Sequence, residues 1–385
     1  MDCRFSAGLR RLRERAAAPG VDPAMEWMDE ARRRIGRVFD AAGLGPQETP
    51  HRVVAAFPGA RLRAYSGRHG AAGAVLLIVP APFKRPYIWD LLPEVSVVRR
   101  CIGRGLRVYL LEWTVPGKDE DGFGLADYAS RLPRAAIEAI AAETGVSAPL
   151  LAGHSLGGTF AAIFATLFPR RVGGLVLVDA PLAFGEKGGP LARAAAVIPH
   201  PRIIREMVGS PVPGSVINAL CAAAAPDAFE LQRFSDLAAS FLDPAALAVH
   251  VRAERWSCDE FPLPGRLFED TLEQLYRDDR FLKGTLQIGD LQTGVARLRG
   301  SAIAVINPVG GVVPPRSVLK GFEAAPDLAV EILEYKGGRG PMLQHLGPLI
   351  APIAHQQLWP RILDWAVAAG RGNRARQRAS PRVTD

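Results

Sequence analysis

The segment PLLAGHSLGGTFAA, residues 149–162, decides the fold of this chain. It contains the pattern G-x-S-x-G, in which Gly153 and Gly157 stand two residues before and after Ser155. The pattern is short enough to occur by chance, so the flanking sequence must separate two interpretations. Ser155 is either a nucleophile on a strained turn between a strand and a helix, or an idle serine in a glycine-rich loop.

Strand and helix patterns alternate on both sides of this turn. Continuous apolar runs of strand length are typical of strands buried on both faces of a parallel sheet. The alternation predicts a doubly wound, mostly parallel α/β sheet of the α/β-hydrolase type, with Ser155 as a nucleophile at the carboxyl end of a strand. The predicted strands are 51–57, 61–67, 73–80, 105–113, 148–152, 174–181, 302–307 and 330–335, and the helices are 24–43, 89–103, 125–144 and 158–168.

The alternation stops after Pro181, and a mostly helical pattern follows. An insertion of this size, after the strand that follows the elbow, predicts a cap that excludes water and shapes an acyl pocket. The predicted organisation is an N-terminal helical segment with a basic disordered start (1–50), the first part of the core (51–181), a helical cap (182–297), the second part of the core (298–370) and a basic disordered tail (371–385).

Composition describes an ordinary globular protein of 385 residues, with 48% apolar and 22% charged residues. The four cysteines are far apart and form no C-x-x-C pair, so neither a disulfide framework nor a zinc site is expected, and no other metal or cofactor motif is present. No apolar run is long enough to cross a bilayer, and no signal-peptide pattern follows the basic start, so a cytoplasmic location is expected.

The net charge of +8 is concentrated at the two ends of the chain. Residues 1–20 carry a net +3 and residues 371–385 a net +4, which leaves only +1 for everything between them. Solvated, poorly ordered ends explain this distribution better than a basic binding face does. No nucleic-acid partner is therefore predicted.

Three residues are candidates for catalysis. A serine hydroxyl needs a base, and His345 follows the last predicted strand, where this fold carries its catalytic histidine. No Asp or Glu occurs between Gly300 and Lys320, so the usual position of the acid is empty, and Asp179 at the end of the strand after the elbow helix is the leading replacement. The alternatives are that Asp179 caps a helix or braces the cap, and that serine and histidine act without a carboxylate.

The predicted oxyanion hole takes one N–H from Leu156, the residue after the serine, and one from the loop after the strand at 73–80. Proline has no N–H, so within that loop the donor is Phe83, our first choice, or Ala81. Lys84 and Arg85 follow, and either attraction of an anionic leaving group such as coenzyme A or ordinary surface charge explains them.

Several longer segments then carry a family resemblance. With them the chain resembles the polyhydroxyalkanoate synthases, above all the short class III form, over most of residues 50–366. The segments are RPYIWDL (85–91), AGHSLGGTFAAIFATLFPRRVGGLVLVDAP (152–181), RAERWSCDEFPLPGRLFEDTLEQLYRDDRFLKGTL (252–286), VINPVGGVVPPRSV (305–318) and LQHLGPLIAPIAHQQLWPRILDWA (343–366).

The chain departs from the family pattern at two catalytic positions. The family's nucleophile is a cysteine where this chain has Ser155, and the family's acid lies just before the V-P-P turn, where this chain has Gly310 and Gly311. His345 matches the family's histidine. A thioester is an activated acyl donor, whereas a serine oxyester is close in energy to a product ester, so transfer to water becomes the more natural outcome.

These considerations predict a hydrolase of 3-hydroxyacyl esters or thioesters that works through an acyl-Ser155 intermediate. One alternative is a polyhydroxyalkanoate synthase or acyltransferase that uses hydroxyacyl-coenzyme A. The other is a non-catalytic relative that binds polymer granules or a partner. The expected partners are a small acyl ester, an acyl-coenzyme A or polyhydroxyalkanoate. The class III resemblance implies a second synthase-type subunit, and a homodimer is the alternative.

Overall fold

The structure is a computed structural model that describes residues 23–65, 73–198, 200–226, 236–238, 240–241, 243–337 and 345–379. The predicted basic start at 1–20 lies outside these residues. Helix α15 (Trp359–Ala379) continues into the predicted disordered tail, so residues 371–379 are helical. Arg, Ala and Gln dominate this stretch, and all three are good helix formers.

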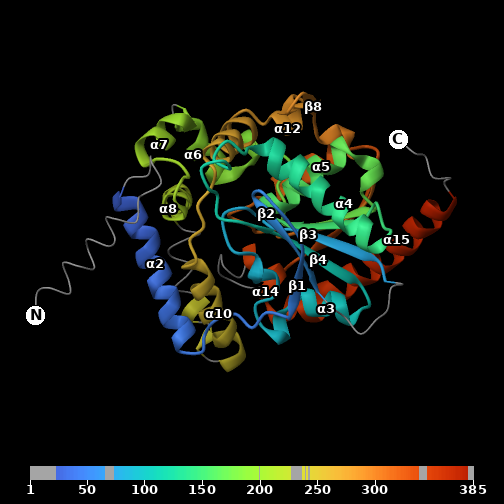
Figure 1. Cartoon of the computed structure of the whole chain (residues 1–385), viewed down its shortest axis with the longest axis horizontal. Helices are drawn as coiled ribbons and strands as arrows, with labels where there is room; N and C mark the ends of the chain where they lie inside the picture. The colour runs from blue at the N-terminus through green and yellow to red at the C-terminus, as the bar shows by residue number, and fades with distance from the viewer. Residues whose placement is uncertain are drawn as a thin grey trace, which may run out of the picture.

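An eight-stranded sheet forms the centre of the molecule (Figure 1). Its order is β1-β2-β4-β3-β5-β6-β9-β10, and the strands from β4 to β10 in this order run parallel, whereas β1 and β2 pair antiparallel at one edge. The predicted mostly parallel sheet is thus confirmed. The strands are β1 (His51–Phe57), β2 (Ala60–Tyr65), β3 (Val75–Val79), β4 (Arg107–Trp113), β5 (Leu150–His154), β6 (Gly174–Val178), β9 (Gly300–Ile306) and β10 (Leu328–Glu334).

Two apolar clusters cover the two faces of this sheet. Successive side chains of a strand point to opposite faces, so in β5 Leu151 joins one cluster while Leu150 and Ala152 join the other. Helices α4 (Leu132–Thr144) and α5 (Leu156–Leu167) cover the first face. Helices α3 (Val97–Gly103), α14 (Gly347–Ile350) and α15 cover the second.

The helix predicted over 89–103 is shorter than expected. Two 3₁₀ turns, Pro86–Trp89 and Pro93–Val95, precede α3, and Ser96 caps the helix by accepting a hydrogen bond from the N–H of Arg99. Both turns begin with proline, which fixes φ and lacks the N–H that a helix interior needs. The α-helix therefore starts only at Val97.

The segment between β6 and β9, where the sequence predicts a cap, is mainly helical, and we call it the cap for its place in the chain alone. Figure 1 shows α6, α7, α8 and α10 gathered at one side of the sheet, together with the N-terminal helix α2 (Pro23–Ala41), which packs against α8 and α10. A short hairpin in the same segment, β7 (Leu286–Ile288) and β8 (Leu291–Thr293), is an element that the helical pattern did not predict. The helices are α6 (Gly189–Val197), α7 (Pro201–Val208), α8 (Gly214–Ala224), α10 (Pro244–Ser257), α11 (Gly265–Asp270) and α12 (Arg280–Lys283).

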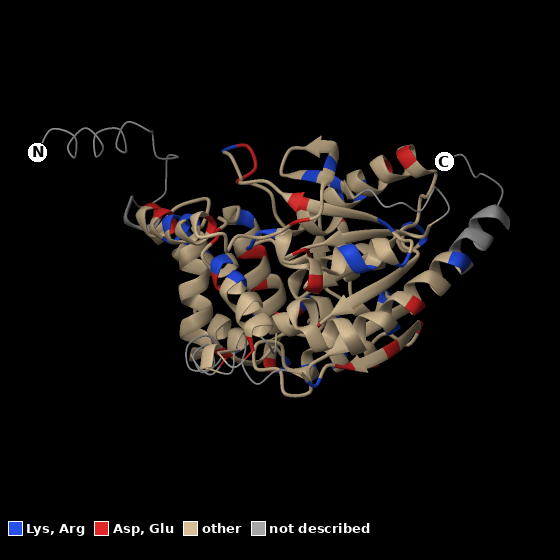
Figure 2. Cartoon of the chain, turned by 90° about the horizontal axis from the view of Figure 1, so that it is seen from below, with Lys and Arg blue, Asp and Glu red and all other residues tan. Residues whose placement is uncertain are grey.

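Charges of both signs are distributed over the described elements. In the view of Figure 2, Lys and Arg alternate with Asp and Glu along the helices and strands instead of gathering on one side. Within the described ranges, no helix combines the length and the apolar character that crossing a bilayer requires.

Candidate active site

Ser155 occupies a strained turn between β5 and α5. Its φ of 53° and ψ of −133° lie outside the regions that most residues adopt, and its side chain is half-buried. The neighbouring glycines make room for the turn: a Cβ on Gly157 would lie 2.2 Å from the carbonyl oxygen of Val79, and one on Gly153 would lie 2.4 Å from the nitrogen of Gly158. The G-x-S-x-G pattern therefore forms a sharp elbow that presents the serine at the N-terminus of α5.

His345 and Asp179 are brought together, although 166 residues separate them in the sequence. His345 Nδ1 lies 2.7 Å from Asp179 Oδ2. Because an ionised carboxylate only accepts hydrogen bonds, Nδ1 carries the proton and Nε2 is left as the proton acceptor. This is the tautomer that a general base requires.

Asp179 is held rigidly at the end of β6. It is buried, its φ is 47°, and its N–H donates to the carbonyl oxygen of Val305 on the neighbouring strand β9 (2.9 Å). Burial raises the pKa of this carboxyl, while the hydrogen bond from His345 and the backbone of Asn307 act in the opposite direction. Thr159 of α5 fixes the chain just beyond it by donating its hydroxyl to the carbonyl oxygen of Pro181 (2.7 Å).

Ser155 and Asp179 lie at adjacent strand ends. In the parallel pair of β5 and β6, His154 is opposite Val178, and the N–H of Ser155 donates to the carbonyl oxygen of Val178 (3.0 Å). His345 contacts both strand ends: its ring meets Asp179, and its carbonyl oxygen meets the ring of His154. In the part of the chain that is described, the Ser155 hydroxyl forms no hydrogen bond to His345, and catalytic pairs are often longer in ligand-free enzymes. The catalytic roles stay predictions.

The loop after β3 lies against the elbow. The nitrogen of Ala81 would be 2.8 Å from a Cβ on Gly157, which places the Ala81 amide beside the first turn of α5. The buried indole of Trp113 anchors the same loop by donating to the carbonyl oxygen of Pro80 (3.0 Å). Among the described residues, no hydrogen bond acceptor is found for the N–H of Ala81 or of Leu156. Ala81 is therefore the predicted donor whose amide lies beside Gly157, while Phe83 was the first choice from sequence, and the catalytic role of either amide stays a prediction.

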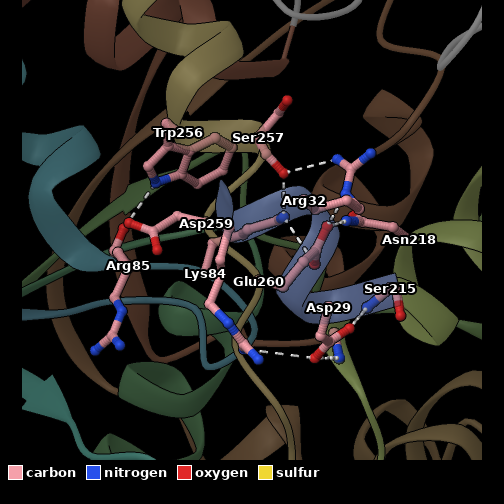
Figure 3. Close-up of polar contacts among 12 residues, drawn as sticks. Asp29, Arg32, Lys84, Arg85, Ser215, Asn218, Trp256, Ser257, Asp259 and Glu260 are labelled. Carbon is pink, nitrogen blue, oxygen red and sulfur yellow. Dashed lines mark hydrogen bonds and ion pairs between the residues drawn. The ribbon is translucent and has the colours of Figure 1, made fainter. Parts of the chain in front are cut away.

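Lys84, at the end of this loop, is tied to the cap (Figure 3). Its ammonium lies 2.6 Å from the carbonyl oxygen of Ser257 and 3.1 Å from Glu260 Oε2. Arg32 of α2 pairs with the same buried carboxylate, and Asn218 of α8 donates to it at 2.5 Å. The suggestion that Lys84 attracts an anionic leaving group is wrong, because its charge is buried and already paired.

Arg85 is also engaged with the cap. Its guanidinium lies 4.8 Å from the ring centroid of Phe261, and its carbonyl oxygen accepts a hydrogen bond from the indole of Trp256 (2.8 Å; Figure 3). Packing against an aromatic ring accounts for this side chain, and nothing in its contacts requires an anionic ligand.

One group of side chains has the composition of a metal site. Ligand-type atoms of His154, Asp179 and His345 all lie within 4.8 Å of one another. His345 Nδ1 and Asp179 Oδ2 are hydrogen-bonded to each other, and His154 Nε2 donates a hydrogen bond to the carbonyl oxygen of His345. Hydrogen bonds therefore explain the cluster, and we assign no metal to it.

From sequence, an exposed Ser155 predicts that His154 points away from the site, and His355 beside Trp359 is predicted to be a packing or surface residue. His355 is 1% exposed, stacks on Trp359 and donates a hydrogen bond from Nε2 to the carbonyl oxygen of Leu349 (2.7 Å), so of these two alternatives the packing residue is confirmed. His154 had been expected to point away from the site, yet it contacts His345 directly. The alternation of β5 was the signal that could have revealed this contact, because it places His154 on the face covered by α14.

Comparisons with known proteins bear on the fold that carries these residues. A family model described as "alpha/beta hydrolase fold" matches residues 88–194, which include the elbow and Asp179. Among solved structures, a carboxylesterase of the thaumarchaeon Nitrososphaera gargenis superposes with a TM-score of 0.50 at 14% identity, covering 84% of this chain and 100% of that one. The chain therefore has the α/β-hydrolase fold.

Curated relatives give a more specific result. The chain is 26% identical over 346 residues to the poly(3-hydroxyalkanoate) polymerase subunit PhaC of Haloferax mediterranei, which covers 89% of this chain and 69% of the relative. It is 28% identical over 295 residues to the PhaC subunit of Synechocystis sp., covering 75% and 76%. The chain thus has the α/β-hydrolase fold and is similar, at a distance, to the PhaC subunits of poly(3-hydroxyalkanoate) polymerases.

Proposed function

We propose that this protein is a serine acyl hydrolase that cleaves 3-hydroxyacyl esters or thioesters through an acyl-Ser155 intermediate. The contact of 2.7 Å between His345 Nδ1 and Asp179 Oδ2, beside a serine on a strained elbow, is the observation that carries the proposal. Fold alone would not carry it, since related folds host many activities.

The first half of the reaction forms the acyl enzyme. Ser155 Oγ attacks the carbonyl carbon of the substrate while His345 Nε2 accepts the hydroxyl proton. Asp179 stabilises the imidazolium that results and keeps the ring in its orientation. When the tetrahedral intermediate collapses, the bond to the alcohol or thiol leaving group breaks, and His345 returns the proton to that group.

Deacylation repeats these steps with water as the nucleophile. His345 Nε2 takes a proton from water, the hydroxide adds to the acyl carbon, and the Ser155 oxygen leaves with that proton. In this proposal the N–H groups of Leu156 and Ala81 stabilise the negative oxygen in both halves, and removing one such donor typically costs about 100- to 1000-fold in kcat.

A second candidate is transfer of the acyl group to a hydroxyl acceptor instead of water. Its support is the similarity to the polymerase subunits, which extends over most of the chain. The serine argues for hydrolysis, because an oxyester on Ser155 lacks the activation that a thioester would bring to polymer growth.

Covalent labelling tests the nucleophile. A fluorophosphonate probe should label the wild-type protein, and labelling should disappear in Ser155→Ala and fall steeply in His345→Gln. Both variants should keep the circular dichroism and unfolding midpoint of the wild type. Absence of labelling in folded wild-type protein would leave the non-catalytic interpretation, a granule-binding or partner-binding relative, as the better one.

Product analysis separates hydrolysis from transfer. With 3-hydroxyacyl-coenzyme A as substrate, release of free thiol should be matched by equal amounts of free 3-hydroxy acid. Oligomers in which one 3-hydroxyacyl group is esterified to the hydroxyl of another would indicate acyl transfer instead. Ser155→Cys is the informative variant, since gain of oligomer formation there would show that the nucleophile alone selects the acceptor.

A further inference from the structure

We propose that His154, the residue before the nucleophile, is a positioning residue that fixes the backbone of His345 and thereby directs its imidazole toward Ser155. His154 Nε2 lies 2.8 Å from the carbonyl oxygen of His345, and the centroids of the two rings are 4.4 Å apart. The inference rests on the proposed function and adds to it a residue outside the serine, histidine and aspartate set.

The sheet explains why His154 reaches this place. Side chains of a strand alternate between faces, so His154 follows Leu150 and Ala152 on the face that α14 and α15 cover. His345 stands two residues before the start of α14, and Leu346 between them packs into the apolar cluster of that same face. The end of β5 therefore contributes the nucleophile at one residue and a support for the base at the preceding one.

The hydrogen bond defines the state of the His154 ring. A carbonyl oxygen only accepts, so Nε2 of His154 carries the proton. Burial lowers the pKa of His154 well below its usual range, and the nearby ring of His345 acts in the same direction. His154 thus remains a neutral donor, and it adds no second positive charge when His345 takes the proton of Ser155.

Two polar anchors consequently hold His345. Asp179 holds the ring through Nδ1, and His154 holds the main chain through the carbonyl oxygen. Without the second anchor the ring could still meet Asp179, but the direction of Nε2 would be less well fixed. A displacement of about 1 Å in a reacting group can cost about 100-fold in rate.

Three substitutions at this position form the test. His154→Gln places an amide N–H at about the reach of Nε2, whereas His154→Asn is too short and His154→Leu has no donor. We expect kcat on a 3-hydroxyacyl thioester to fall about 10- to 100-fold in the Leu and Asn variants with KM little changed, and to return to within about threefold of wild type in the Gln variant. Equal kcat in all four proteins would overturn the proposal, and the matched Gln and Asn variants keep the test valid if Leu does not fold.

A measurement without turnover separates this proposal from the proposed function. The Nδ1 proton shared by His345 and Asp179 should give a downfield proton resonance that is lost in Asp179→Asn. In the Asn and Leu variants at position 154 this proton should exchange with solvent at least tenfold faster than in the wild type and the Gln variant. If the wild type neither hydrolyses nor labels, this exchange still tests the positioning role. Unchanged exchange in every variant at position 154 would reject that role even in an active enzyme.

Discussion

In the proposed mechanism, Asp179 takes the place of the acid that is missing after β9. The carboxylate lies one strand closer to the nucleophile than the usual position, at the end of β6, and still bonds to the histidine that follows β10. This works because the ends of parallel strands meet at one edge of the sheet, so a side chain on either neighbouring strand can reach a loop above them.

Substitution of Asp179 by Asn tests this role. An amide cannot stabilise the imidazolium and can donate to Nδ1, which favours the wrong tautomer, so kcat should fall about 1000- to 10,000-fold with little change in KM. Stability should change little, because burial raises the pKa of the carboxyl and charge at this site is not favoured by its surroundings. Steady-state kinetics and urea unfolding are the measurements.

The control is Asp364→Asn, at a carboxylate with a 60% exposed side chain on α15. It should leave both kinetic constants unchanged. Nearly normal kcat in Asp179→Asn would mean that serine and histidine act without a carboxylate, and that Asp179 is only a structural residue at the entrance to the cap.

Residue patterns predicted some parts of the site better than others. Ser155, Asp179 and His345 each follow a strand, and strand ends can be recognised from apolar runs and glycines. The choice between Ala81 and Phe83 depends on which amide of the loop approaches Gly157, a distance that no pattern contains. His154 was placed in the elbow correctly, and the alternation of β5 indicates the face on which it lies, but no pattern identifies its partner, a main-chain oxygen 191 residues away.

Glu260 connects three elements, namely helix α2, the cap and the loop after β3 (Figure 3). This carboxylate is completely buried and meets Lys84 from the loop, Arg32 from α2 and Asn218 from α8. Asp29 strengthens the same junction by accepting hydrogen bonds from the N–H groups of Gly214 and Ser215 at the start of α8. The loop that carries the proposed oxyanion donor is therefore fastened to the cap and the N-terminal helix.

Breaking this junction should destabilise the protein. Lys84→Met removes one of the two cations around a fully buried carboxylate, and loss of one partner of a buried pair typically costs about 3–5 kcal/mol. We expect the lower end of this range, about 3 kcal/mol in the free energy of unfolding, because Arg32 and Asn218 still meet Glu260. Denaturant titration of the full chain checks this value.

The matched control is Lys320→Met, which removes a cation from an exposed pair with Glu323 and should change the same quantity by less than about 0.5 kcal/mol. Equal effects of the two substitutions would show that the junction contributes no more than a surface ion pair. Adding Glu260→Gln to Lys84→Met should cost less than the sum of the single changes, since it removes the charge that Lys84 leaves unpaired.

Element patterns predicted the sheet more fully than the cap. The buried strands have continuous apolar runs, which indicate where along the chain each strand lies. The structure has strands at these positions. The cap has short helices whose partners are distant in sequence, and the hairpin β7–β8 has only three residues in each strand, too few for an alternation to be distinguished. The contacts of Glu260 span 176 residues to Lys84, so no local pattern could predict them.

At the scale of the whole molecule, stability should depend on pH through buried neutral histidines. His355 joins α15 to the rest of the second face: Arg100 of α3 donates to its Nδ1 (2.6 Å), and its Nε2 donates to the carbonyl oxygen of Leu349 (2.7 Å). Burial lowers the pKa of His355 to about 4. Burial likewise lowers the pKa of His154.

The sign of the dependence follows from proton binding. An unfolded histidine titrates near pH 6.5, so between about pH 6.5 and 4 the unfolded chain binds a proton at His355 that the folded protein does not. The free energy of unfolding should therefore be highest above pH 6.5 and fall by up to about 1.4 kcal/mol per pH unit for this group as the pH is lowered, with no further loss from it below about pH 4. His154 acts in the same direction.

Urea unfolding at pH 7.5, 6.5, 5.5 and 4.5 measures this slope. His355→Gln should lower stability at pH 7.5, because the hydrogen bonds to Arg100 and Leu349 are weakened, but its stability should decrease less steeply than that of the wild type toward pH 4.5. His51→Gln, at an exposed position of β1, is the control and should keep the wild-type slope.

The pH profile can also distinguish histidines from carboxylates as the cause of acid sensitivity. Carboxylates that lose stabilising charge act mainly below pH 5, so a loss that begins only there, and is the same in His355→Gln, would attribute acid sensitivity to them and not to the histidine that anchors α15.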